Sequence, residues 1–142
     1  MIVLDTTALV YPVGTEHPAR EPTRRLVDAI GAGRVHASTT AEVVQEFAHV
    51  YARRRSRPAA ARHARRYAAL LSPLLPITAD DLEFSLSLFE RHPQLGPFDA
   101  LVAAVAITHR ADALVSADSG FAAVPRLNHI APGTAAFDRL VG

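Results

Sequence analysis

Short apolar runs alternate with longer amphipathic segments along most of this chain. Four of the runs are apolar on both faces, as buried parallel strands are. A fifth run carries Pro125 near its start, which suits a strand at the edge of a sheet. We therefore predict strands at residues 1–4, 34–38, 74–78 and 113–117, and a short edge strand within residues 124–130.

The segments between these runs carry signals for helix starts and stops. Thr39 or Thr40 can cap one helix, and Thr78 or Asp80 can cap another. Two further helices have a proline at their start, where a missing N–H costs nothing. The predicted helices span residues 21–30, 40–55, 58–71, 78–91 and 97–110, with a last turn of helix in the tail from residue 135.

Strands that alternate with helices predict an α/β fold whose sheet is mainly parallel, with right-handed crossovers. The chain has 142 residues, of which 49% are hydrophobic, so it can bury a core and is not expected to be disordered. No repeat or low-complexity linker divides it. We expect a single domain over residues 1–142.

The composition excludes several kinds of chemistry. The chain has no cysteine, which rules out disulfides, thiolate metal sites and cysteine nucleophiles. All 15 cationic residues are arginine, as codon bias in a GC-rich genome would produce. Without lysine there is no P-loop, no Schiff base and no lysine acting as a general base.

The apolar runs are too short for targeting or membrane segments. The first run ends at Asp5 with no basic residues before it, unlike a signal peptide. The run at residues 100–107 is far short of the ~20 residues that span a bilayer. We expect a cytoplasmic protein with no membrane association.

Positive charge is unevenly distributed, although the net charge is only +1. No acidic residue occurs between Glu46 and Asp80. A basic patch there would bind phosphates, whereas the purely structural alternative is a helical hairpin whose arginines are solvated. The seven arginines of this stretch are Arg53, Arg54, Arg55, Arg57, Arg62, Arg65 and Arg66.

Four carboxylates carry the candidate chemistry: Asp5, Glu46, Asp99 and Asp118. Asp5 and Asp118 follow apolar strands, and the other two belong to predicted helices. In an open parallel sheet, the carboxyl ends of the strands line one crevice. Carboxylates gathered there repel one another unless they hold protons or a cation, and oxygen ligands suit Mg²⁺ or Mn²⁺.

Each of these acids also has a purely structural interpretation. Asp5 suits a helix N-cap or an Asx turn, and Asp118 suits the turn before a glycine. Asp99 in a first helical turn complements the helix dipole. Glu46 could pair with Arg53 or Arg54. Their joint placement, and none of them singly, favours a functional site.

A helical projection separates Glu46 from its neighbour Glu42. Glu46 falls beside Val43 and Val50 on the border of the apolar face, and Glu42 lies one step closer to solvent. A carboxylate beside a buried stripe needs a partner. Glu46 is therefore the better ligand candidate, and Glu42 is expected in a supporting position or on the surface.

Hydroxyl groups flank the last acid. Ser116 and Ser119 stand on either side of Asp118 and could bind a metal-bound water or a phosphate oxygen. The seven histidines are scattered without the spacing of a metal site. Ion-assisted hydrolysis of phosphodiesters is the chemistry that this set of residues favours.

In these motifs the chain resembles the PIN-domain ribonucleases, and specifically the VapC toxins of toxin–antitoxin pairs. The resemblance covers nearly the whole chain. It rests on Ile2-Val3-Leu4-Asp5-Thr6-Thr7, Val44-Gln45-Glu46-Phe47, Phe98-Asp99-Ala100-Leu101-Val102-Ala103-Ala104 and Leu114-Val115-Ser116-Ala117-Asp118-Ser119-Gly120-Phe121.

The resemblance implies a PIN-like three-layer α/β/α fold with strand order 3-2-1-4-5. It implies that Asp5, Glu46, Asp99 and Asp118 surround Mg²⁺ or Mn²⁺, with Thr6 and Ser116 as the accompanying hydroxyls. Some relatives have one more acid where this chain has Ser119-Gly120-Phe121, so the number of ions stays open. The resemblance further implies cleavage of RNA in a tRNA or ribosomal RNA loop, a VapB-like antitoxin that blocks the acidic crevice, and a homodimer.

Other folds with a strand-end aspartate fit less well. A haloacid-dehalogenase-type phosphatase needs a second aspartate where this chain has Thr7, and it uses a lysine. A receiver domain needs paired acids and a lysine, and a dinucleotide-binding module needs a glycine-rich turn. The alternative that stays open is a catalytically silent PIN fold that binds RNA or another protein.

Overall fold

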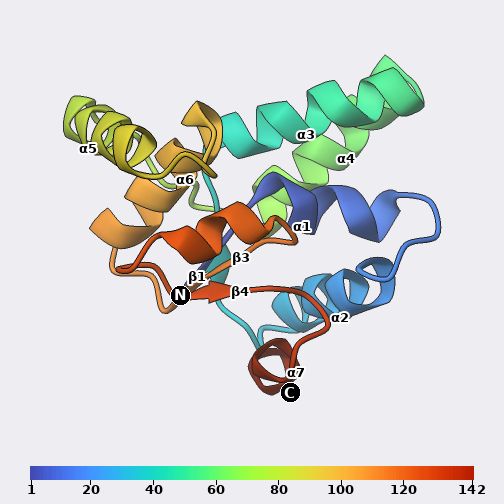
Figure 1. Cartoon of the computed structure of the whole chain (residues 1–142). Coiled ribbons are helices and arrows are strands. Elements are labelled where there is room, and N and C mark those ends of the chain that lie inside the picture. Colours follow the sequence, from blue (N-terminus) through green and yellow to red (C-terminus); the bar gives the residue numbers. More distant parts are fainter.

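The computed structural model describes all of residues 1–142 as a small parallel sheet surrounded by helices (Figure 1). The strands are β1 (Ile2–Leu4), β2 (Ala37–Ser38), β3 (Ala113–Val115) and β4 (His129–Ile130). The α-helices are α1 (Thr6–Val10), α2 (Arg20–Gly31), α3 (Ala41–Arg54), α4 (Arg57–Leu70), α5 (Ala79–Arg91), α6 (Pro97–Thr108) and α7 (Ala135–Val141). Two 3₁₀ helices, η1 (Tyr11–Val13) and η2 (Ser119–Ala123), complete the chain.

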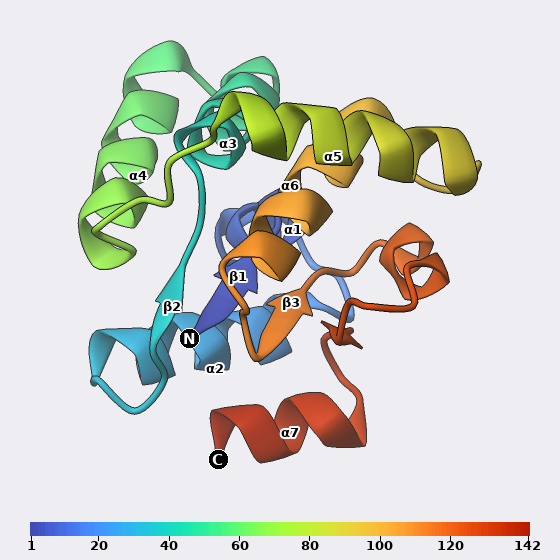
Figure 2. The same cartoon turned by 90° about the vertical axis from the view of Figure 1, so that its left-hand side faces the viewer.

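The four strands form one sheet in the order β2-β1-β3-β4, and every pair is parallel. Ile2 of β1 stands opposite Ala37 on one side and Ala113 on the other. In Figure 2, α3 to α6 lie above the strands, and α2 and α7 lie below them. The predicted α/β/α arrangement is confirmed.

One predicted strand is reduced to a single bridge. Residues 74–78 were expected to form the third strand, but only Leu75 pairs with the sheet, through a parallel bridge to Thr40. Pro73 and Pro76 surround Leu75, and a proline has no N–H to give to a ladder. The order is therefore the expected one with its outermost strand reduced to that bridge. The predicted strands 34–38 and 124–130 are also shorter than expected.

The segment after β1 was not expected to be helical. Residues 6–13 form α1 and η1, with Asp5 at the N-cap position of α1 and with extended backbone angles. The Asp5 side chain makes no capping hydrogen bond. A helix of five residues is too short to show a clear hydrophobic period, which explains why the pattern missed it.

Capping residues fix where the longer helices begin. The Thr40 hydroxyl accepts a hydrogen bond from the Val43 N–H at the start of α3. Thr78 and Asp81 exchange hydrogen bonds in a capping box at the start of α5. Both helices therefore start where the sequence predicted, and α3 carries Glu46 in its middle.

Helix α6 packs against the sheet through small side chains. Ala100, Ala103 and Ala104 are fully buried, and Ala106 almost so. Small residues let the helix axis approach the sheet closely, so the first turn of α6 lies near the strand ends. This close packing determines where Asp99 lies.

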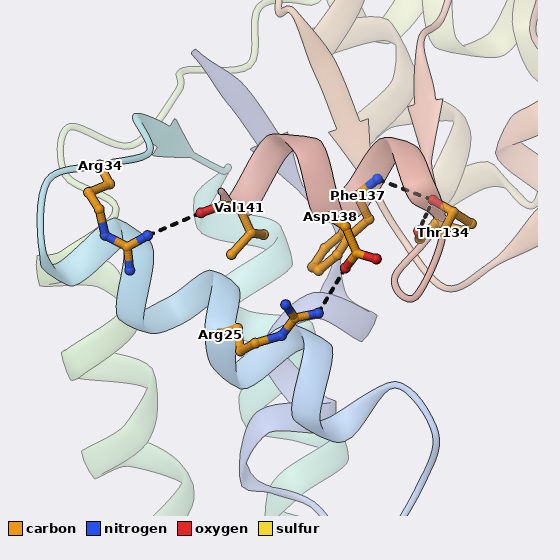
Figure 3. Close-up of polar contacts among 7 residues, drawn as sticks. Arg25, Arg34, Thr134, Phe137, Asp138 and Val141 are labelled. Carbon is orange, nitrogen blue, oxygen red and sulfur yellow. Dashed lines mark hydrogen bonds and ion pairs between the residues drawn. The ribbon is translucent and has the colours of Figure 1, made fainter.

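The C-terminal helix α7 is held against α2 (Figure 3). Arg25 on α2 pairs with Asp138 at 2.9 Å, and an Arg34 Nη donates to the Val141 carbonyl oxygen at 3.1 Å. Phe137 and Val141 of α7 are buried in the same hydrophobic core as the strands. No helix in the structure is both long enough and apolar enough to cross a membrane.

Candidate active site

The four predicted carboxylates line one crevice, a cavity of about 250 Å³ at the carboxyl ends of the strands. Asp5 follows β1 and Asp118 follows β3, so both lie where parallel strands end. Glu46 comes from the middle of α3, and Asp99 from the first turn of α6. Four segments that are far apart in the sequence thus meet at one place.

Asp5 is the most buried and most firmly held of the four, with 3% of its surface exposed. The Ser116 hydroxyl donates to Asp5 Oδ2 at 2.7 Å, and the Thr7 hydroxyl donates to the same oxygen at 3.3 Å. The other oxygen, Oδ1, is buried without any hydrogen-bond partner. A buried carboxylate oxygen with no partner is costly unless something else binds it.

Glu46 is held by one hydroxyl. Thr6 Oγ1 donates to Glu46 Oε2 at 2.7 Å, and this contact links the first turn of α1 to the middle of α3. Neither ion pair of the structure includes Glu46, so the alternative of a pair with Arg53 or Arg54 is wrong. Glu46 is exposed on the side that faces the crevice.

A close approach of two loops places Asp118 beside the first turn of α6. Asp118 Oδ1 accepts a hydrogen bond from the Gly120 N–H at 2.8 Å, as the structural interpretation of a turn predicted. A Cβ atom on Gly120 would lie 2.7 Å from the carbonyl oxygen of Gln94, in the loop before α6. Only glycine therefore lets these two loops pack as they do, with Asp99 and Asp118 in one cavity.

The electrostatics of the crevice reflect this crowding. Burial first, and then the negative charges of Asp5 and Asp118, raise the pKa of Asp99 to about 7. Burial also raises the pKa of Asp5, and the hydrogen bond from Ser116 partly offsets that rise. The crevice therefore favours a bound proton or a bound cation over four bare negative charges.

The residues suit a hard divalent cation, although they are not yet arranged as a finished metal site. No three Asp, Glu or His side chains stand close enough to hold an ion as they are. Each carboxylate is instead turned to a hydroxyl, to an N–H or toward a neighbouring acid. Nevertheless, the four carboxylates, among them Asp5 with its unpaired Oδ1, form the all-oxygen donor set that Mg²⁺ or Mn²⁺ prefers.

The accompanying hydroxyls divide into two groups. Ser116 is fully buried, donates to Asp5 and accepts from the Asp118 N–H at 3.0 Å, so it joins the two strand-end acids. Thr6 orients Glu46. Ser119, by contrast, is exposed at the start of η2 and is not part of the crevice wall, and Glu42 lies in a neighbouring groove beside Phe98.

The predicted basic patch is spread over several faces of the molecule. Arg54 alone of the seven lines the acidic crevice. Arg55 lines the cavity next to it, and Arg66 lines a cavity between α2 and α4. Arg53 and Arg57 line an open groove on the α3–α4 hairpin, and Arg62 and Arg65 are exposed on α4.

Sequence reasoning missed two residues of the site. Thr7 Oγ1 contacts both Asp5 and Ser116 and accepts the Ala117 N–H at 2.9 Å. Tyr11, on η1, also lines the crevice. The paired threonines after Asp5 were a signal for Thr7, whereas nothing in the local pattern marked Tyr11.

Comparison with known proteins identifies the family of the chain. The PIN domain family matches residues 2–127. The chain is 48% identical to Ribonuclease VapC7 of Mycobacterium tuberculosis, over all of this chain and 99% of that protein. It is 31% identical to VapC ribonuclease Mb1869c of Mycobacterium bovis, over 92% of this chain and all of that protein.

Two solved structures share the fold. The VapBC2 complex of Rickettsia felis, bound to a DNA fragment from its promoter, superposes with a TM-score of 0.70 at 19% identity, over 92% of this chain and 98% of that one. A toxin–antitoxin complex from Klebsiella pneumoniae superposes with a TM-score of 0.61 at 22% identity, over 89% and 95% of the two chains. The chain therefore belongs to the PIN-domain family and, within it, to the VapC proteins.

Proposed function

We propose that this chain is a Mg²⁺- or Mn²⁺-dependent endoribonuclease and the toxin of a toxin–antitoxin pair. One observation carries the proposal: four carboxylates from four separate segments line a single crevice, with one buried oxygen of Asp5 left unpaired. The VapC relatives named as ribonucleases support the same activity.

The residues of the crevice have separate tasks in this proposal. Asp5, Glu46, Asp99 and Asp118 would hold the cation. Thr7 and Ser116 keep Asp5 in place, and Thr6 does the same for Glu46. A bound divalent cation supplies the positive charge that makes water a better nucleophile and stabilises charge on the leaving oxygen.

The rim of the crevice supplies a contact for the substrate. Arg54, at the C-terminal end of α3, shares the cavity with the acids and would meet a phosphate oxygen of the RNA backbone. No histidine lines this crevice. Proton transfer would therefore depend on water and the carboxylates, and not on an imidazole base.

The test is cleavage of total cellular RNA by the purified protein with Mg²⁺, Mn²⁺ or EDTA. We expect discrete products with either metal, none with EDTA, and none from Asp5→Asn. Asp80→Asn, which removes an exposed acid on α5, is the matched control and should cleave like wild type. Folded wild-type protein that cuts no RNA with either metal would instead support a silent binding module.

The RNA and protein partners are part of the same proposal. We expect the substrate to be a loop of a tRNA or ribosomal RNA, because unpaired bases can enter a crevice that a duplex cannot. We also expect a VapB-like antitoxin, acting in the cytoplasm, to cover the crevice. Sequencing the cleavage ends identifies the RNA, and adding the purified antitoxin should stop cleavage.

An apolar stripe supports the proposed homodimer. Leu82, Leu86 and Phe89 are exposed at helical spacing on α5, and Phe98 at the start of α6 is 74% exposed. Large exposed apolar groups that lie together commonly mark an interface. Leu86→Arg should convert a dimer to a monomer in sedimentation experiments, whereas Glu83→Arg, elsewhere on α5, should leave it dimeric.

A further inference from the structure

A second cavity opens directly beside the acidic crevice. Its volume is about 630 Å³, more than twice that of the crevice, and the two share Val10, Tyr11 and Arg54 as common walls. The loop between η1 and α2 forms much of the rest, on the side of the molecule where α3 ends (Figure 1). A ligand bound in one cavity can therefore continue into the other.

Aromatic rings line this second cavity in fixed positions. The rings of Tyr11 and His17 stack at 4.2 Å with 17° between their planes. The Ala19 N–H donates to His17 Nδ1 at 3.0 Å, so the imidazole is held although the residue is exposed. Tyr51, half-buried and stacked on Phe47, lines the same cavity. An exposed ring held by two contacts is a ready platform for another flat group.

The charged residues of the cavity indicate how a bound nucleic acid would be oriented on that platform. Arg54, at the end of α3, supplies positive charge where the cavity joins the crevice, Arg55 adds a second positive charge to the lining, and Glu16 is the one acidic residue there. A phosphate backbone would follow the arginines and avoid Glu16. A base attached to that backbone would then point toward Tyr11 and His17.

We propose that this cavity binds the base of a single-stranded nucleotide next to the cleaved phosphate, stacked on the Tyr11–His17 pair. The inference rests on the proposed ribonuclease function and adds a binding subsite to it. Stacking on an aromatic ring accepts any base and strengthens binding by roughly 5-fold or more for each base. The subsite would thus select unpaired nucleotides, because a base within a duplex cannot leave its stack freely.

The test compares two fluorescent probes that carry the same phosphate charge. One is an eight-nucleotide oligoadenylate, and the other is an eight-unit ribose-phosphate chain without bases. Binding is measured by anisotropy with Mg²⁺ in an Asp99→Asn background, which prevents cleavage. We expect the oligoadenylate to bind at least about 5-fold more tightly than the abasic chain.

The variants of His17 test the ring itself. His17→Ala should lower the ratio of the two affinities about 5-fold, and His17→Phe should keep it, because phenylalanine restores a stacking face. The dependence of binding on salt should not change in His17→Ala, since stacking releases no counterions, but it should weaken in Arg54→Gln. His36→Ala, an exposed histidine near the opposite ends of the strands, is the matched control.

The possible failures are distinguishable. Equal binding of the two probes, or a ratio that His17→Ala leaves unchanged, would overturn the subsite while RNA cleavage by wild type would still support the proposed function. Loss of antitoxin binding in His17→Ala with an unchanged probe ratio would assign the cavity to the protein partner and also overturn it. A ratio that depends on His17 in a protein that cuts no RNA would keep the subsite and reject the nuclease.

Discussion

At the scale of single residues, the site depends on how each carboxylate is supported. Ser116 is the key support, because one hydroxyl donates to Asp5 and accepts from the backbone of Asp118. Asp99 has no such hydroxyl support, and burial together with the negative charges of Asp5 and Asp118 raises its pKa. Replacing Ser116 is therefore expected to weaken the site, whereas replacing Asp99 is expected to stabilise the metal-free protein.

Replacing Ser116 should weaken the site without unfolding it. Ser116→Ala removes the hydrogen bond that lowers the pKa of Asp5, so that carboxyl holds its proton to higher pH. We expect Mn²⁺ affinity to fall about 10-fold at pH 7, a typical cost for losing a group that orients a ligand. Calorimetric titration with Mn²⁺ measures it. Ser119→Ala removes an exposed hydroxyl and should bind Mn²⁺ like wild type; equal loss in both would refute the assignment.

Replacing Asp99 should stabilise the metal-free protein at neutral pH. Its folded pKa of about 7 lies above the ordinary value of 3.8, so the folded state binds this proton more tightly than the unfolded state. Its contribution to stability is fully present below about pH 4 and is lost as pH rises through 7. Asp99→Asn should therefore melt higher than wild type at pH 8 in EDTA, with little difference at pH 4.

The measurement is the thermal midpoint of both proteins from pH 4 to pH 8. Burial lowers the pKa of His63, so this residue reduces the stability of both proteins as pH falls below 6.5. The difference between the two thermal midpoints cancels that effect and reports on Asp99. Mg²⁺ at pH 8 should raise the midpoint of wild type and leave that of Asp99→Asn nearly unchanged. A wild-type midpoint that exceeds that of Asp99→Asn at pH 8 in EDTA would contradict the raised pKa of Asp99.

At the scale of elements, the crevice exists because strand ends and helix starts are packed closely together. The alanine face of α6 brings its first turn to the end of β3, and Gly120 allows the loop before α6 to touch the loop after β3. The bridge from Thr40 to Leu75 anchors the chain just before α3, the helix that carries Glu46. Small residues and short loops thus position acids that are far apart in sequence.

Adding one methyl group at Gly120 should disturb this packing. A Cβ atom 2.7 Å from the Gln94 carbonyl oxygen cannot be accommodated without moving backbone. We expect Gly120→Ala to lower the free energy of unfolding by about 1–3 kcal/mol and to reduce RNA cleavage as Asp99 and Asp118 separate. Urea unfolding and a cleavage assay measure the two effects. Gly31→Ala, which meets only a side-chain carbon at 4.0 Å, should cause neither.

At the scale of the whole molecule, one hydrophobic core joins both ends of the chain. It includes residues from Ile2 to Val141, so α7 belongs to it although α7 lies beyond the residues that match the PIN family. Figure 3 shows α7 packed on α2, and no residue of α7 lines the acidic crevice. The helix should therefore matter for stability and not for the chemistry of the crevice.

Removing the buried ring of Phe137 tests whether α7 contributes to stability without contributing to the crevice. Phe137 is fully buried, and Phe137→Ala should cost about 3–5 kcal/mol of unfolding free energy. Asp138→Asn breaks only the exposed pair with Arg25 and should cost about 1 kcal/mol or less. Both variants should cleave RNA like wild type at a temperature where they are folded. Lost cleavage in folded Phe137→Ala would show that α7 also shapes the crevice.

Much of this protein follows from local patterns in its sequence. The alternation of apolar runs with capped amphipathic segments predicts the parallel sheet and most of the helices, because caps and periodicity act over a few residues. Asp5 and Asp118 could be identified as candidate site residues from the same local pattern, because each follows a short apolar run. Only tertiary structure decided how they meet: the unpaired oxygen of Asp5, the closeness of Asp99 to Asp118, and the Tyr11–His17 platform all depend on contacts between separate segments. Such contacts follow from packing in three dimensions and leave no mark in a local pattern, whereas the prolines around Leu75 are a local signal against a strand, because a proline has no N–H to give to a ladder.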